Sequence, residues 1–255
     1  MNNLEKYFKE NSIKYVLFDM DRTLVDTGPY FHERMYKTVL KVVKDLYRNE
    51  TFKKQKERTE DILDISTNYY RKTYTPILVD QLTLLAIEMY LSKDNLNYNK
   101  KDIESVLKRN YKNFYNSSPS LFPYTVKTLN QIAELNVNIG VYSHAQYQWT
   151  KKKIDRIIQE YEKEYNSDLN LPFYTTDIND SKDSTGWEKA ARHLKFPIEN
   201  TLVVGDSLTS DIYPAIDAGF KYLVYLFHSN EVPKIETDAH VFLTKNVGTI
   251  SDIDF

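Results

Sequence analysis

The sequence predicts an α/β fold with a parallel sheet, and three observations support this prediction. Short apolar runs that favour β-strands alternate with helical patterns in residues 1–27 and 119–255. Three of the predicted strands end in polar residues, which is typical of the ligand-binding edge of a parallel sheet. Between the first two strands lies a stretch with helical periodicity and no clear strand.

Five strands are predicted, at residues 14–18, 137–142, 173–176, 201–204 and 222–227. The first is a buried-type run that ends abruptly at Asp19, and the second ends at Ser143. The fourth ends at Gly205-Asp206. Because ligands bind at the carboxyl ends of parallel strands, these polar residues are candidates for one site.

Helical patterns connect these strands at residues 126–135, 149–165, 185–194 and 212–218. Three more, at 30–47, 76–91 and 102–115, lie between breaker clusters at Thr27-Gly28-Pro29 and at 117–123. The sequence therefore predicts an α/β domain made of 1–27 and 119–255, with 28–118 as a helical insert. The run Lys151-Lys152-Lys153 is interpreted as part of a solvated helix face.

Composition excludes several classes of protein. The 255 residues carry a net charge of −2, which argues against a protein that coats nucleic acid. With no cysteine, disulfides, cysteine-based zinc sites, iron–sulfur clusters and thiol nucleophiles are excluded. Neither a signal peptide nor an apolar run of about 20 residues is visible. We expect a cytoplasmic protein with no nucleic-acid or membrane partner.

Two acidic motifs follow predicted strands. In Asp19-x-Asp21-x-Thr23, one carboxylate can attack an electrophile while the other handles a proton, although such a pair also occurs in solvated turns. Asp206 and Asp211 offer hard oxygen ligands for Mg²⁺. The alternative is a helix N-cap, which explains one of these acids but not a second one five residues later.

Two further residues are weaker candidates on their own. The hydroxyl of Ser143, at the end of a strand, can hold a phosphate oxygen or simply form a turn. Lys182, between the third predicted strand and the next helix, can offset charge near a phosphoryl group. A lone lysine is more often a solvated surface charge.

In this order, the four elements resemble the motifs of the haloacid dehalogenase superfamily of hydrolases. The segment Phe18–Thr27 is similar to the family's first motif, Ser143 to its second, Lys182 to its third, and Gly205-Asp206 with Asp211 to its fourth. There are departures from the pattern. Arg22 stands where the family usually has glycine, Tyr124 replaces a common glycine, and the usual prolines after the third-motif lysine are missing.

The resemblance implies a Rossmann-like core with 28–118 as an α-helical cap, and it implies roles for individual residues. Asp19 would form an aspartyl-phosphate, and Asp21 would protonate the leaving group and then activate water. The implied ligands of Mg²⁺ are Asp19, the backbone carbonyl of Asp21, Asp206 and the nearby Asp211. Ser143 and Lys182 would bind the phosphoryl group, and Thr23 would support the loop at the substrate. His144 is unusual for the family at the position after Ser143, and we expect it to contact substrate.

The function expected from this resemblance is a Mg²⁺-dependent phosphatase of a small phosphorylated metabolite. Dehalogenases of the family typically lack the second acid, because halide leaves without a proton, so Asp21 favours an oxygen leaving group. A phosphomutase of the β-phosphoglucomutase type is the alternative, and a non-catalytic binding module is a further one. A signalling receiver domain is disfavoured by the Asp-x-Asp spacing, the insert and the length of the chain.

Overall fold

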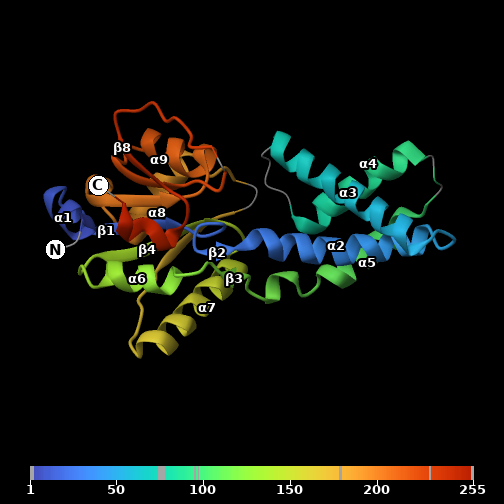
Figure 1. The fold of residues 1–255 in the computed structure, drawn as a ribbon, viewed down its shortest axis with the longest axis horizontal. Coiled ribbons are helices and arrows are strands. Elements are labelled where there is room, and N and C mark those ends of the chain that lie inside the picture. The colour runs from blue at the N-terminus through green and yellow to red at the C-terminus, as the bar shows by residue number, and fades with distance from the viewer. Residues whose placement is uncertain are drawn as a thin grey trace. The chain divides into compact units, whose positions relative to one another are not determined.

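The computed structural model describes residues 3–73, 78–94, 96, 98–177, 180–229 and 231–253 (Figure 1). The chain forms two compact units. We call Met1–Thr27 with Ser118–Phe255 the core unit, and Gly28–Ser117 the helical unit.

A parallel sheet of six strands, in the order β5-β4-β1-β6-β7-β8, forms the centre of the core unit (Figure 1). Its strands are β1 (Tyr15–Asp19), β4 (Asn138–His144), β5 (Phe173–Thr176), β6 (Thr201–Gly205), β7 (Tyr222–Leu226) and β8 (His240–Thr244). All five predicted strands are present, so the predicted α/β fold is confirmed. The sequence analysis does not predict β8, because this strand at the sheet edge is only partly buried and its apolar pattern is weak.

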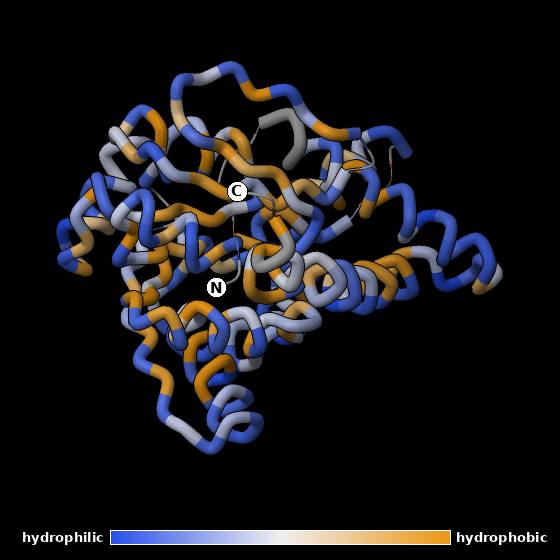
Figure 2. The backbone as a smooth tube through the Cα atoms, turned by 60° about the vertical axis from the view of Figure 1, so that its left-hand side comes forward, coloured by the Kyte–Doolittle hydropathy of each residue, from blue (hydrophilic) through white to orange (hydrophobic). Residues whose placement is uncertain are grey.

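Helices cover both faces of the sheet. Side chains alternate along β1, so Val16 and Phe18 pack into one hydrophobic cluster and Leu17 into the other. The first cluster contains residues of α1 (Asn3–Glu10), α6 (Thr125–Ala133) and α7 (Tyr147–Tyr165), and the second contains residues of α8 (Ser184–Leu194) and α9 (Tyr213–Asp217). Hydrophobic and hydrophilic colours alternate along the coiled parts of the tube in Figure 2, as expected of amphipathic helices. The core unit is therefore a three-layer α/β/α structure.

A second, two-stranded sheet lies where the chain leaves the core unit and returns to it. β2 (Val25–Asp26) pairs antiparallel with β3 (Ser120–Leu121), with Val25 opposite Leu121. The Thr125 hydroxyl donates to the carbonyl of Leu24 at 3.0 Å and adds a further link between the two segments. Strands of two residues carry no periodicity, so the sequence analysis does not predict this pair.

The helical unit contains α2 (Thr27–Leu46), α3 (Phe52–Thr73), α4 (Val79–Asp94), α5 (Lys100–Tyr111) and the short 3₁₀ helix η1 (Phe114–Asn116); α2 begins one residue before the boundary. The helices predicted at 30–47, 76–91 and 102–115 correspond to α2, α4 and α5 with η1, and residues 76 and 77 lie outside the described residues. None of the described helices is long and apolar enough to span a membrane.

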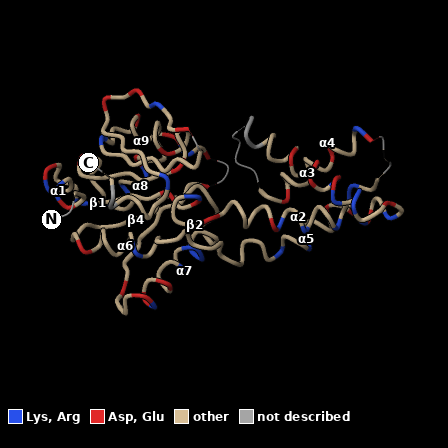
Figure 3. Tube along the Cα trace, in the orientation of Figure 1, with Lys and Arg blue, Asp and Glu red and all other residues tan. Residues whose placement is uncertain are grey.

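Helix α3 is not predicted, because its sequence is strongly polar and its apolar periodicity is weak. Figure 3 shows acidic and basic residues along it. Arg58 of α3 binds both carboxylate oxygens of Glu50 at 2.8 Å and donates to Asp94 of α4 at 2.6 Å. Its guanidinium also lies 4.0 Å from the ring centroid of Tyr47. Charge-assisted contacts of this kind stabilise the position of a helix that offers few apolar side chains.

Candidate active site

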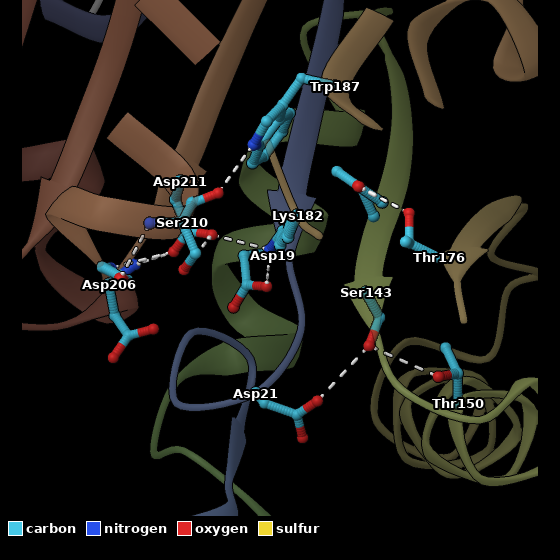
Figure 4. A network of polar contacts seen from close by, with 12 residues as sticks. Asp19, Asp21, Ser143, Thr150, Thr176, Lys182, Trp187, Asp206, Ser210 and Asp211 are labelled. Carbon is cyan, nitrogen blue, oxygen red and sulfur yellow. Dashed lines mark hydrogen bonds and ion pairs between the residues drawn. The ribbon is translucent and has the colours of Figure 1, made fainter. Parts of the chain in front are cut away.

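The predicted strand-end residues lie at one edge of the sheet. Asp19 is the last residue of β1, and β1 pairs with β4 on one side and β6 on the other. Ser143 lies near the end of β4, and Asp206 follows the last residue of β6. Because all three strands run in the same direction, their carboxyl ends bring these residues together (Figure 4).

Three aspartates form an acidic cluster at this edge. Asp19, Asp206 and Asp211 each offer a carboxylate oxygen, and these oxygens lie within 4.8 Å of one another. Asp19 and Asp211 are buried, and Asp206 is partly buried. These are the three side chains that the family resemblance implies as metal ligands, beside the backbone carbonyl of Asp21.

The turn after β6 holds Asp211 in this cluster. Oδ2 of Asp211 accepts hydrogen bonds from the backbone N–H groups of Asp206 at 3.1 Å and Ser207 at 2.9 Å. The Ser207 hydroxyl, rather than either acid, caps the π-helical turn η3 (Leu208–Ile212) by accepting from the N–H of Ser210. A Cβ at position 205 would lie 2.5 Å from the Cβ of Asp211, so this approach requires Gly205.

Lys182 joins two of the three acids. Its ammonium contacts Asp19 and lies 2.7 Å from Oδ1 of Asp211. Asp183, the next residue, caps α8 by accepting from the N–H of Gly186 at 3.0 Å, so the helix begins directly after the lysine. The missing prolines therefore do not prevent Lys182 from lying beside Asp19.

Two aromatic residues enclose Lys182, and the sequence analysis does not identify either of them. The ammonium lies 5.0 Å from the ring centroids of both Tyr142 and Trp187. Both side chains are fully buried. The indole N–H of Trp187 donates to the carbonyl of Ser210 at 2.9 Å, which links α8 to the turn that carries Asp211 (Figure 4). Their only signal in the sequence is a Tyr directly before Ser143 and a Trp five residues after Lys182.

The acidic cluster holds more negative charge than Lys182 balances. Burial, together with Asp211 and Asp21, raises the pKa of Asp19 to about 7 in spite of Lys182. Burial and then Asp211 also raise the pKa of Asp206 well above its ordinary value. Although burial alone would lower the pKa of Lys182, Asp19 and Asp211 raise it. Three hard oxygen donors around an excess of negative charge fit a divalent cation such as Mg²⁺.

Asp21 lies beside Ser143 and a lysine that the sequence analysis assigns to solvent. The Ser143 hydroxyl is 3.4 Å from Oδ2 of Asp21. Lys153 of α7 donates to both carboxylate oxygens of Asp21, at 2.6 and 2.7 Å, and its side chain is 0% exposed. The prediction of a solvated face is thus wrong for Lys153, because the 3.6-residue period turns it inward, while Lys151 and Lys152 are exposed.

The turn after β1 explains the position of Arg22 and Thr23. Arg22 has φ 64°, in the left-handed region that favours glycine, and its guanidinium Nε lies 3.5 Å from Oδ2 of Asp206. Thr23 is fully buried, and its hydroxyl has no hydrogen-bond partner among the described residues. Its place at the substrate stays a prediction.

His144 follows Ser143 at the end of β4. Its Nε2 lies 3.1 Å from the carbonyl oxygen of Asp177, in the loop after β5. Burial and then Lys182 lower the pKa of His144. A neutral ring that donates to this carbonyl is consistent with these surroundings, and its contact with substrate stays a prediction.

Comparisons with known proteins agree with this geometry. Residues 13–219 match the family model of haloacid dehalogenase-like hydrolases. No match was found among curated proteins. Similar solved structures include a 2-haloacid dehalogenase from Pseudomonas syringae pv. Tomato DC3000, which is 16% identical with a TM-score of 0.55, over 94% of this chain and 97% of that chain.

Two further similar structures have other activities in their descriptions. A haloacid dehalogenase-family phosphatase from Thermococcus onnurineus is 14% identical with a TM-score of 0.53, and a proposed β-phosphoglucomutase from Thermotoga maritima is 15% identical with a TM-score of 0.61. Each covers 94% of this chain and 97% of its own. These likenesses show a shared fold, and the family match spans most of the sequence. The chain therefore belongs to the haloacid dehalogenase-like hydrolase family.

Proposed function

We propose that the protein is a Mg²⁺-dependent phosphatase of a small phosphorylated metabolite, with Asp19 as nucleophile. The observation that carries this proposal is the arrangement around β1: Asp19 lies in the acidic cluster with Lys182, while Asp21, two residues later, faces Ser143. The proposed nucleophile, the acid and Ser143 thus come from the ends of the adjacent strands β1 and β4, and Lys182 comes from the loop before α8. The helical unit is proposed as the cap domain of the family.

Several groups have to act together in this reaction. Hydrolysis of a phosphate monoester needs an acceleration of up to about 10²¹-fold. One preorganised donor contributes about 10²–10³-fold. When bound by Asp19, Asp206, Asp211 and the carbonyl of Asp21, Mg²⁺ would offset the negative charge that gathers at the phosphoryl oxygens.

The protein's own residues account for the bonds that change. A carboxylate oxygen of Asp19 attacks phosphorus, the bond from phosphorus to the leaving oxygen breaks, and that oxygen takes a proton from Asp21. Asp21, now a carboxylate, then takes a proton from water as the water oxygen attacks the aspartyl-phosphate, which releases phosphate and restores Asp19. Lys182 and Ser143 hold the phosphoryl oxygens during both steps.

The second acid argues for an oxygen leaving group. Displacement of halide requires no proton donor, so Asp21 would have no role as an acid in a dehalogenase. An ester oxygen leaves far more readily when it is protonated and departs as an alcohol. A phosphomutase is the second candidate, because Asp21 would serve equally well when the phosphoryl group returns to a sugar hydroxyl. A binding module is disfavoured, since all four motif positions keep reactive side chains.

The test is multiple-turnover release of phosphate from p-nitrophenyl phosphate and from a panel of phosphorylated sugars, nucleotides and organic acids, with Mg²⁺ present. A phosphatase releases phosphate over many turnovers. Activity only on a hexose phosphate with a bisphosphate primer would identify a mutase instead. Halide release from 2-haloacids without phosphate release would contradict both.

A further inference from the structure

The side chain of Lys153 is a buried ammonium that none of the four motifs uses. It is 0% exposed, and both of its hydrogen bonds to carboxylate go to Asp21, at 2.6 and 2.7 Å. The Lys153 nitrogen also lies 4.0 Å from the ring centroid of Trp149. The lysine thus holds one specific carboxylate, the one that we propose handles the leaving-group proton.

Helix α7 presents a second contact to the same place. Thr150 and Lys153 lie three residues apart, on the same face of the helix. The hydroxyl of Thr150, also fully buried, donates to the Ser143 hydroxyl at 3.4 Å, and Ser143 in turn donates to Oδ2 of Asp21 at 3.4 Å (Figure 4). One face of α7 therefore supports both the phosphoryl-binding hydroxyl and the acid.

Stability alone is a weak reason to bury this lysine. Removing an ammonium from water is costly, and replacing a buried ion pair by apolar side chains of similar volume is often neutral or stabilising. The exposed neighbours Lys151 and Lys152 show that the helix can keep lysines in solvent. The geometry instead favours a role that depends on where the Asp21 carboxylate points.

We propose that Lys153 is a positioning residue that holds the Asp21 carboxylate toward Ser143, in the direction of the leaving-group oxygen. This inference rests on the proposed phosphatase function. A residue of α7, which lies outside the four family motifs, would thus influence how fast the enzyme releases poor leaving groups. Loss of Lys153 should matter most where the leaving oxygen depends on a proton.

The experiment compares phenyl phosphate with p-nitrophenyl phosphate, two aryl esters of similar shape. Nitrophenolate leaves readily as an anion, whereas phenolate depends more on protonation. For Lys153→Met, which keeps the approximate side-chain length, we expect kcat/KM on phenyl phosphate to fall about 10–100-fold, which is part of the roughly 10²–10⁴-fold that general acid–base catalysis contributes. On p-nitrophenyl phosphate we expect it to fall less than about threefold. The ratio kcat/KM is used because it reports the step in which the leaving group departs.

Two further variants isolate the cause. In an Asp21→Asn background, Lys153→Met should no longer change the ratio between the two esters, because the acid through which it acts is gone. Lys152→Met, on the adjacent exposed position of α7, should leave both rates unchanged. If Lys153→Met does not fold, as judged by circular dichroism, Lys153→Gln keeps a polar donor and should show the same selective loss to a smaller degree.

The outcomes separate the two proposals. Equal losses on both esters, or a change in ratio that persists in the Asp21→Asn background, would overturn the positioning role and leave the phosphatase proposal standing. A wild-type protein that hydrolyses neither these esters nor the metabolite panel would overturn both, because Asp21 would then have no leaving group to protonate.

Discussion

Two sides of the site differ in their balance of charge. On the side of β6, Asp19 shares Lys182 with Asp211, and Asp206 lies within the same cluster, so carboxylates outnumber the lysine. On the side of α7, Asp21 forms an ion pair with Lys153, and no other carboxylate of the described residues pairs with that lysine. Two acids only two residues apart in the sequence thus have different surroundings.

Exposure adds to this difference. The side chain of Asp19 is 9% exposed, whereas that of Asp21 is 29% exposed. A buried acid among other acids favours a bound cation, whereas the partly exposed Asp21 is accessible to water and to a leaving group. The surroundings of the two aspartates, which share a residue type, therefore distinguish the roles that we propose for them as nucleophile and acid.

The largest effect is expected from Asp19→Asn. The amide cannot form the acyl phosphate, so kcat should fall at least about 10⁴-fold, as for removal of other enzymatic nucleophiles. Phosphate release measures the loss, and circular dichroism establishes that the fold persists. Asp217→Asn, on the exposed end of α9, is the matched control. Turnover at the wild-type rate would remove Asp19 from its proposed role.

Removal of the metal should have the next largest effect. Chelation should lower turnover by about 10²-fold or more, given the weight of charge stabilisation in such sites, and added Mg²⁺ should restore it. A measurement independent of activity is the unfolding temperature, which Mg²⁺ should raise in the wild type because it binds only the folded state. Asp206→Asn should abolish this rise. Undiminished turnover after chelation would contradict the cation site.

The pH dependence of stability tests the charge excess on the Asp19 side. The pKa of Asp19 is raised from 3.8 to about 7, so the folded state binds more protons than the unfolded state between these two pH values. The free energy of unfolding of the metal-free protein should therefore fall as pH rises from about 4 to 7, by at most about 4 kcal/mol from this group. Urea unfolding at several pH values measures it.

Asp19→Asn is the reference for that measurement. As pH rises across the same range, the wild type should lose free energy of unfolding relative to this variant. Saturating Mg²⁺ should reduce the shift, because the cation favours the ionised carboxylates. A difference that stays constant with pH would mean that the pKa of Asp19 is not raised in the folded state.

The smallest effects are expected at the two aromatic residues beside Lys182. Trp187→Phe keeps a ring near Lys182 but loses the hydrogen bond to Ser210, which at about 1 kcal/mol corresponds to a fall of roughly fivefold in kcat/KM. Tyr142→Phe keeps its ring and loses only the hydroxyl that is 2.7 Å from Thr176, so it should change kcat/KM less. A larger loss in Tyr142→Phe than in Trp187→Phe would mean that the hydrogen bond from Trp187 to Ser210 contributes less to kcat/KM than the Tyr142 hydroxyl does.

Much of the architecture could be predicted from local pattern. The strands that end at Asp19, Ser143 and Gly205 are short apolar runs followed by polar residues, a signal contained within a few positions. Helix α3 and strand β8, which were not predicted, have no such local signal. Helix α3 depends on Arg58 and its distant acids, and β8 depends on pairing with β7.

The amino-acid sequence by itself determined the parallel α/β core, the helical insert and the residue types at the strand ends, because hydrophobic periodicity and chain order are local properties. Only the tertiary structure decided which lysine accompanies which aspartate. Three consecutive lysines at 151–153 look alike in the sequence, and the face that α7 packs against the sheet determines that Lys153 alone of the three is buried against Asp21. Burial disfavours the charged form of a side chain, so a buried lysine needs a carboxylate partner that an exposed lysine does not need. Which lysine is buried depends on the folded chain.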